Sequence, residues 1–322
     1  EFILYLKKQG FSYDNIEILD LRTNRIDTLV ADNFIAQAAF TLAPDQRTIA
    51  YTWADIDKYE IRLVDLYRPA VPVRLMKSRG LPLTPKFSED GEWIYYAEFN
   101  KDERSEIKRI HIDGGTVEPI PIKEWIWKQP MKKVSLKTLV GGTPVASRIS
   151  VLTENGHPVI PETTTLHSEG QHGAVFYYSP GEIELLIPEG KVTIMATHGF
   201  ETKPYSTEII VDNNSEQHTI NLERIWDAGA SGWFAGDNHF HLNYGGASQL
   251  DPEDLILELK GEGMDVAFPL VANLHNRYLD EKLFGWSTNQ APFVQFGQEV
   301  RSHFLGHLNL IGTNELFWPW IW

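Results

Sequence analysis

The residues with the clearest chemical potential lie in the segment 232–246, where His239 and His241 are two positions apart. Alternate residues of a β-strand face the same side, so both imidazoles are expected to leave one face of a strand near its C-terminal end. Neutral imidazole nitrogens bind divalent zinc, manganese or iron. Asp237 lies two residues earlier, where it can orient a ligand. We therefore predict a divalent metal site, with Asp237 in a catalytic supporting role.

Two later residues are further candidates for this site. Glu299 follows an apolar run that is typical of a strand, and His307 begins another such run. Each has an ordinary alternative: Glu299 taken alone is more often an exposed carboxylate at a strand end, and His307 can be a core histidine bonded to a backbone carbonyl. Both fall at predicted strand ends, as the histidine pair does. We predict that all four side chains converge on one point.

The segment that follows the histidine pair predicts the elements that position it. Residues 251–254 begin a helix, because Asp251 suits an N-cap, a proline follows and acidic residues fill the first turn. Glycines at 261 and 263 end that helix, and the next strand is predicted at 264–268. Strand, helix and strand in this order start a βα barrel, in which reactive residues lie at the strand ends.

The sequences GDNHFHLNYGG and GQEVRSHFLGHLNLIG resemble the metal-dependent hydrolase domain of the CehA/McbA family, in the PHP (polymerase and histidinol phosphatase) group. The resemblance implies that His239 and His241 form the first metal pair. It implies that Glu299 is the bridging carboxylate and that His307 is the histidine of the Gly-His strand. On this basis the predicted metal ligands are His239, His241, Glu299 and His307, and Glu299 is also assigned a catalytic role. These motifs are confined to the segment from residue 232 to just beyond residue 306.

The chain departs from this family pattern in two places. The PHP group usually carries Thr-Asp-His-Asn at the end of its second strand, whereas residues 268–273 read FPLVAN and lack the Asp and His. Asn273 or His275 is the available substitute. The sequence also stops in the apolar run 317–322, and closing a barrel of this type takes about another hundred residues. We expect the sequence to be part of a longer chain.

A repeat organises the first third of the chain. The sequence IEILDL at 16–21 recurs as IRLVDL at 61–66, an offset of 45 residues (61 − 16), and a looser copy lies at 107–112. A period of 40 to 50 residues with several strands in each repeat is typical of propeller blades. The alternative is an ordinary β-sandwich whose strands are alike by chance.

A second element keeps the same offset and favours the propeller. Residues 42–51 align with 87–96, so that Asp45 matches Asp90 in a turn that precedes a β-rich run. These repeats resemble the blades of TolB-like propellers. About three blades are present, the first of them partial, whereas propellers have about four to eight. We predict that Asp45 and Asp90 occupy equivalent turns.

The middle third predicts a β-sandwich of about 80 residues, because short strands alternate with turns there. It resembles the carboxypeptidase-regulatory or fibronectin-like modules that precede many secreted catalytic domains. The segment 123–137 is rich in Lys and Trp and is predicted to be a connection. No chemistry is expected in the sandwich, whose histidines are scattered.

Composition excludes several functions. The 322 residues include 44 Asp and Glu but 29 Lys and Arg, a net charge of −15, so nucleic acid and anionic membranes are unsuitable partners. The absence of cysteine excludes disulfides, thiol nucleophiles and cysteine-ligated zinc. The sequence has no apolar run of about 18 residues, so it predicts no transmembrane helix.

Together these patterns predict a mainly β N-terminal part, of propeller blades and a sandwich, followed by a partial α/β PHP-like barrel. The predicted domains are the blades at 1–122, the sandwich at 144–224 and the truncated hydrolase domain at 230–322. The predicted function is hydrolysis of an ester, amide, carbamate or phosphoester of a small-molecule or peptide-like substrate by a metal-activated water. The alternative is a non-catalytic binding or scaffold protein with a degenerate barrel. A periplasmic or extracellular location is expected, with the cytoplasm as the alternative.

Overall fold

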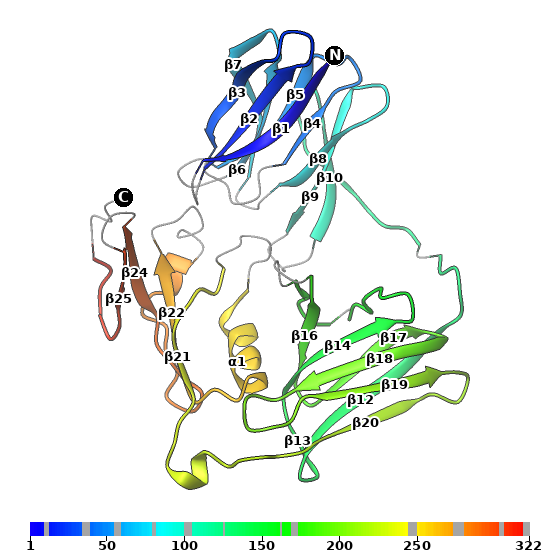
Figure 1. Ribbon diagram of the computed structural model, residues 1–322, viewed down its shortest axis with the longest axis vertical. Coiled ribbons are helices and arrows are strands. Elements are labelled where there is room, and N and C mark those ends of the chain that lie inside the picture. The colour runs from blue at the N-terminus through cyan, green and yellow to red at the C-terminus, as the bar shows by residue number, and fades with distance from the viewer. Residues whose placement is uncertain are drawn as a thin grey trace. The chain divides into compact units, whose positions relative to one another are not determined.

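The computed structural model divides the chain into two compact units (Figure 1). Unit 1 comprises Glu1–Glu124, Asn243–Gln249 and Leu274–Lys282, and unit 2 comprises Trp125–Leu242, Leu250–Asn273 and Leu283–Trp322. The structure describes residues 1–9, 13–33, 39–54, 59–78, 82–99, 105–124, 126–161, 163–168, 173–243, 250–272, 280–302 and 306–317. None of the helices in these ranges is long and apolar enough to cross a membrane.

Unit 1 contains three antiparallel sheets in which consecutive strands pair. The first sheet has three strands, β1 (Phe2–Gln9), β2 (Tyr13–Asp20) and β3 (Arg25–Asn33). The second has four, β4 (Phe40–Leu42), β5 (Thr48–Ala54), β6 (Tyr59–Asp65) and β7 (Arg68–Ser78). The third also has four, β8 (Leu83–Phe87), β9 (Trp93–Phe99), β10 (Ser105–His111) and β11 (Glu118–Ile120). Two complete four-stranded meanders after a three-stranded one match the predicted blades, with the first incomplete.

The repeated turns of the second and third sheets have the same local structure. One carboxylate oxygen of Asp45 accepts a hydrogen bond from the backbone N–H two residues later at 2.8 Å, and that of Asp90 does so at 3.0 Å. The next residue has a left-handed backbone in both turns, with φ of 54° at Gln46 and 77° at Gly91. Asp45 and Asp90 therefore occupy equivalent turns, as the repeat predicts.

The sheets also share a position that the sequence repeat did not reveal. Tyr5 in β1 lies opposite Glu17, Tyr51 in β5 opposite Arg62, and Tyr96 in β9 opposite Lys108. A tyrosine on one strand thus faces a charged residue on the next in all three sheets. This extends the repeat to β1, the first strand of the chain.

Unit 2 contains a β-sandwich whose sheets enclose one apolar core. One sheet consists of β13 (Thr143–Pro144), β12 (Met131–Val140), β17 (Glu182–Pro188) and β20 (Gln217–Leu222), the last paired in parallel with β12. The other consists of β15 (His167–Ser168), β16 (Val175–Ser179), β14 (Ser147–Thr153), β18 (Gly190–Thr197) and β19 (Tyr205–Val211). The nine strands agree with the predicted sandwich. The first of them, β12, begins before residue 144, where the sandwich was predicted to start.

The prediction that 123–137 is a connecting segment was wrong for its second half. β12 begins at Met131 and is a central strand of the first sheet, paired with β17 on one side and β20 on the other. Val134 and Leu136 are buried in the core, whereas Lys133 and Lys137, at the alternate positions on either side of them, are more exposed. The lysines gave the segment the composition of a linker, although the alternation of buried and outward residues is that of a strand. The sandwich therefore starts near residue 131 rather than 144.

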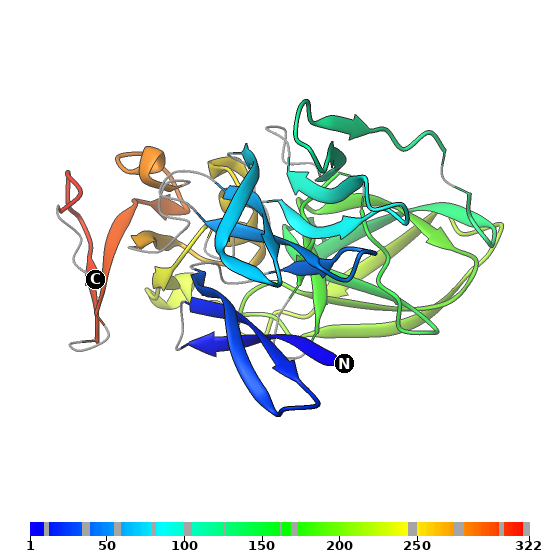
Figure 2. The same cartoon turned by 90° about the horizontal axis from the view of Figure 1, so that it is seen from above.

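The remainder of unit 2 is a five-stranded sheet with one α-helix. Its main path is β21 (Gly236–Phe240), β22 (Val266–Ala272), β24 (Gly297–Ser302) and β25 (Gly306–Leu310), and β23 (Phe293–Val294) also pairs with β22. β21, β22 and β24 run parallel, whereas β25 is antiparallel to β24. Figure 2 shows the β24–β25 pair from a second direction, in orange and red. The described residues contain no second α-helix, so this sheet supplies one βα unit, not the repeated units of a barrel.

Helix α1 (Pro252–Gly261) connects β21 to β22 and begins as predicted. The side chain of Asp251 accepts hydrogen bonds from the N–H groups of Glu253 and Asp254, and Asp254 bonds back to the N–H of Asp251. This reciprocal capping satisfies donors that a helix start otherwise leaves open. Leu255 and Leu259 are buried in the core that the helix shares with the sheet. The strand after the helix starts two residues later than predicted and runs further.

Candidate metal centre

The candidate site is centred on the carboxylate of Glu299 in β24. Its side chain is 1% exposed, and β24 is an inner strand with β22 on one side and β25 on the other. A buried carboxylate is costly unless cations or donors surround it. The ordinary alternative for Glu299, an exposed carboxylate at a strand end, is therefore wrong. Parallel pairing places its neighbour Ala272 at the C-terminal end of β22.

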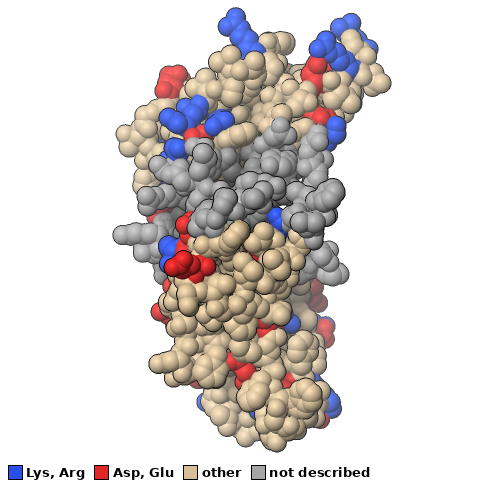
Figure 3. All heavy atoms as spheres, turned by 90° about the vertical axis from the view of Figure 1, so that its left-hand side faces the viewer, with Lys and Arg blue, Asp and Glu red and all other residues tan. Residues whose placement is uncertain are grey.

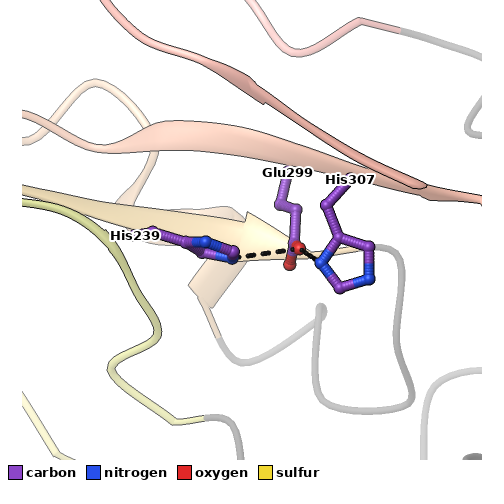
Figure 4. Close-up of side chains that lie close together, drawn as sticks. All are labelled: His239, Glu299 and His307. Carbon is purple, nitrogen blue, oxygen red and sulfur yellow. Dashed lines mark hydrogen bonds and ion pairs between the residues drawn. The ribbon is translucent and has the colours of Figure 1, made fainter.

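Three histidine rings surround this carboxylate. Nε2 of His239 lies 3.1 Å from Oε1 of Glu299, and Nδ1 of His307 lies 2.6 Å from the same oxygen. Nε2 of His241 lies 3.0 Å from the other oxygen, Oε2. Figure 4 shows that the rings of His239 and His307 approach the carboxylate from different strands. The predicted convergence of the four side chains is found, although their role as metal ligands remains a prediction.

A curved sheet brings the histidines together. His239 lies in β21 and His307 in β25, the two outer strands, with two strands between them. Neighbouring strands are about 4.8 Å apart, so in a flat sheet these two residues would be separated by about 14 Å. Nδ2 of Asn309 in β25 donates to the carbonyl oxygen of Asn238 in β21 at 3.3 Å. The outer strands therefore approach each other, and one concave face carries the site.

Glu299 is biased towards its ionised form. Burial raises the pKa of its carboxyl group, but the contact with His241 and the nearby charges of His307 and Arg301 outweigh burial, so the net pKa is below its usual value. Glu299 is therefore expected to be a carboxylate at neutral pH. That is the form in which glutamate binds metal ions.

The hydrogen bond of His241 fixes which of its nitrogens faces the site. Nδ1 lies 2.8 Å from the carbonyl oxygen of Leu270 in β22, so we assign the proton to Nδ1. Nε2 is then the nitrogen that faces Oε2 of Glu299, 3.0 Å away. A proton or a metal ion can lie between these two atoms. This arrangement suits a cation next to Oε2.

The two oxygens of Glu299 have different partners. One nitrogen each of His239 and His307 and one oxygen of Glu299 all lie within 4.8 Å of one another, which defines a three-residue group around Oε1. His241 approaches Oε2 instead. Chelation of a single ion by the pair His239 and His241 stays a prediction, since the two rings approach different oxygens of Glu299. The carboxylate lies between two positions, one on each oxygen.

Arg301 is a neighbour of the site that the motif comparison did not assign. Its Nε donates to Nε2 of His307 at 3.3 Å and lies 4.0 Å from Oε1 of Glu299. Arg301 is two residues after Glu299 on the same strand, so the period of two places it on the same face. That spacing was the available sequence signal, and it was missed because arginine is an uncommon metal neighbour.

Asp237 does not orient a histidine ring. Its Oδ1 accepts a hydrogen bond from the backbone N–H of His239 at 2.9 Å. The carboxylate therefore shapes the backbone of β21, so its predicted catalytic role finds no support in this contact. Asn273 and His275, the suggested substitutes for the missing Thr-Asp-His-Asn, lie outside the described residues.

Comparisons with known proteins give matches among solved structures but none in sequence. No protein-family profile matches the chain, and no curated protein matches it in sequence. Similar solved structures include TolB from Acinetobacter baumannii, with 14% identity over 66% of this chain and 51% of that chain and a TM-score of 0.34. Another is the β-propeller domain of the Trilobed protease from Pyrococcus furiosus, with 12% identity over 70% and 67% and a TM-score of 0.30.

A TolB from Agrobacterium tumefaciens is also similar, with 16% identity over 58% of this chain and 70% of that chain and a TM-score of 0.35. The chain spans about half the length of the Acinetobacter protein. The Pyrococcus neighbour is described as a β-propeller domain, and the chain itself is mainly β.

Proposed function

We propose that the chain carries a divalent metal site at Glu299 and belongs to a metal-dependent hydrolase of the CehA/McbA type, within the PHP group. The observation that carries the proposal is a carboxylate, 1% exposed, with imidazole nitrogens 2.6–3.1 Å from its oxygens. Ligand atoms bound to one metal ion at about 2.0–2.2 Å are typically about 3 Å apart, so these side chains need little movement to bind one.

The donor set indicates which metals fit. Three imidazoles and one carboxylate suit zinc, manganese or iron, whereas a site made only of oxygens would suit magnesium or calcium. His239, Glu299 and His307 would hold an ion at Oε1, and His241 would contact a second position at Oε2. When bound, such an ion lowers the pKa of a coordinated water towards neutrality and polarises the bond to be cleaved.

The residues around the ligands have supporting roles in this proposal. The carbonyl of Leu270 holds the ring of His241, a contact of the kind that orients metal-binding histidines. The side chains of His239 and His307 are 43% and 42% exposed, which leaves one side of the site open to a substrate. The carboxylate of Glu299 is itself shielded from water, so its charge is screened less than that of an exposed carboxylate.

Metal content and hydrolysis measured together test the proposal. The chain, purified without an affinity tag that binds metal, is analysed for zinc, manganese and iron by mass spectrometry, alongside Glu299→Gln and His239→Ala. His157→Gln is the matched control, because His157 is an exposed histidine of the sandwich. We expect about one or two equivalents of metal and cleavage of p-nitrophenyl esters by the parent and the control, both lost in the site variants.

Two outcomes would contradict it. Equal metal content in the parent and in Glu299→Gln would show that the metal binds elsewhere. A chain that binds none of the three metals at micromolar concentration would favour a protein whose blades and sandwich bind a partner without catalysis.

A further inference from the structure

A second pocket lies in unit 2, at the opposite ends of β21 and β22 from the candidate metal centre. It has a volume of about 520 Å³ and is lined by residues that precede both strands, including Ala235 and Asp265. The strands are parallel, so the pocket is at their N-terminal ends and Glu299 is near their C-terminal ends. This pocket is therefore separate from the proposed hydrolytic site.

Four aromatic side chains line this pocket and are exposed to solvent. The exposed fractions are 85% for Phe200, 49% for Trp226, 66% for Trp233 and 77% for Phe234. Aromatic rings of this size are usually buried, and several gathered at one concave place mark a binding site. On the face shown in Figure 3, the visible surface of unit 2 is mostly uncharged, with scattered acidic and basic groups.

The backbone of the pocket wall is held by hydrogen bonds rather than by the aromatic rings. Glu201 accepts from the N–H of Ala228 at 3.1 Å, and Asp227 accepts from the N–H of Ala230 at 2.9 Å. Arg224 lies 3.6 Å from Glu201 and 3.2 Å from Asp227. The wall is thus built by contacts that leave the ring faces unoccupied.

Close backbone contact forms another side of the pocket. Gly199 and Gly263 both have left-handed backbones, with φ of 58° and 64°. A Cβ on Gly199 would lie 2.6 Å from the carbonyl oxygen of Glu262, so only glycine fits there. The pocket is therefore preformed, which lowers the entropy cost of binding a ligand.

Charge distinguishes between the ligands that would suit these rings. Arg224 pairs with both Glu201 and Asp227, and Asp265 accepts a hydrogen bond from the N–H of Ala235 at 2.9 Å. Lys260 is exposed, and among the described residues no ion pair engages it. A saccharide needs several available donors and acceptors, most of which are committed here. One cation beside aromatic faces suits an aromatic ring that carries a carboxylate.

We infer that this pocket binds a small aromatic carboxylate, whose ring packs against Trp226 and Trp233 and whose anionic group pairs with Lys260. The site is independent of the proposed metal centre. It takes a ligand by shape and charge, without any covalent step.

Binding of indole-3-acetate, measured by isothermal titration calorimetry on the full chain, tests this assignment. Indole-3-acetamide, which has the same ring without the charge, and decanoate, which has the charge without a ring, are the comparison ligands. We expect the aromatic acid to bind about fivefold to tenfold more tightly than either, because each lacks one of the two interactions. Equal affinity for the acid and the amide would contradict the role of Lys260, and tighter binding of decanoate would contradict ring stacking.

Variants separate this pocket from the metal centre. Lys260→Gln should weaken binding of the acid about fivefold and leave the amide unchanged, whereas Trp233→Ala should weaken both. Lys191→Gln is the control, since Lys191 pairs with Glu208 on the sandwich at 2.8 Å. Circular dichroism checks that each variant is folded. Loss of binding in Glu299→Gln with full binding in Lys260→Gln would place the acid at the metal centre and overturn the inference.

Discussion

The carboxylates of the two units are satisfied in different ways. In the blade turns, Asp45 and Asp90 accept hydrogen bonds from backbone groups two residues away. In the candidate metal centre, Glu299 faces side chains from β21 and β25, of which His239 is 60 residues distant. A turn held by local hydrogen bonds recurs wherever its short sequence recurs, as in the blade repeat. A site assembled from distant strands depends on how the sheet curves, so it can be lost while the local structure survives.

Truncating an equivalent core residue in each four-stranded sheet tests whether repeated positions also contribute equally to the free energy of unfolding. Ile49 and Ile94 hold matching positions and both are 0% exposed. Ile49→Ala and Ile94→Ala should each lower the free energy of unfolding by about 2–4 kcal/mol, because each leaves a cavity in a packed core. Urea unfolding followed by circular dichroism measures this. If the two losses in the free energy of unfolding differ by more than about 2 kcal/mol, the repeat extends to the backbone but not to the energetics of the core.

Replacing the carboxylate of Glu299 should weaken metal binding, whereas the matched change in unit 1 should not. Glu299→Gln is expected to weaken zinc binding by about 100-fold, since it removes the one carboxylate that the described part of the chain contributes to the three-residue group. Competition with a fluorescent chelator measures the affinity. Asp90→Asn is the matched carboxylate-to-amide change in unit 1 and should leave zinc affinity within about twofold of the parent. A similar loss in both variants would mean that the site and the blades are not independent.

Much of the fold could be predicted from local pattern. The blade turns follow from the spacing of Asp45 and Asp90, and the start of α1 follows from Asp251 and the proline after it. The four site residues could be named by motif, because a motif is a local string. The start of the sandwich was misplaced, since lysines on the outer face of β12 obscured its alternation.

Other features could not be predicted because they depend on strand pairing. Nothing near His241 in the sequence shows that Leu270 supplies its hydrogen-bond acceptor, since the pairing of β21 with β22 brings them together. The same holds for the division of the histidines between the two oxygens of Glu299. The antiparallel β24–β25 pair also departs from the predicted barrel, in which parallel strands alternate with helices.

Acid should reduce the contribution of the turn carboxylate of Asp45, in unit 1, to the free energy of unfolding. Burial raises the pKa of Asp45, but hydrogen bonds from the N–H groups of Thr48 and Arg47 outweigh it, and the net pKa is lowered. Its stabilising effect is therefore present above the ordinary aspartate pKa and is lost as the pH falls through the lowered value. Asp45→Asn should cost about 0.5–1 kcal/mol at pH 7 and progressively less as the pH falls below the ordinary aspartate pKa. Unfolding curves at pH 7 and pH 3 measure this, and an equal cost at both would contradict it.

A smaller loss of stability in acid is also expected in the sandwich, because partial burial of a histidine there disfavours its charged form. Burial lowers the pKa of His218, whose Nε2 lies 3.1 Å from the hydroxyl oxygen of Tyr205. The unfolded chain therefore binds a proton more readily, and stability falls as the pH drops below about 6.5 towards the lowered value. His218→Gln keeps a hydrogen-bonding side chain and should flatten this part of the pH profile. An unchanged slope between pH 7 and pH 5 in thermal unfolding would show that His218 does not contribute.

Anomalous X-ray diffraction from crystals grown with zinc, recorded on both sides of the zinc absorption edge, tests the central claim most directly. The account predicts a peak about 2.0–2.2 Å from Oε1 of Glu299 and from ring nitrogens of His239 and His307, and a second peak beside Oε2 if both positions fill. The absence of an anomalous peak at Glu299 would contradict the account. Zinc bound only at surface histidines outside this sheet would also contradict it.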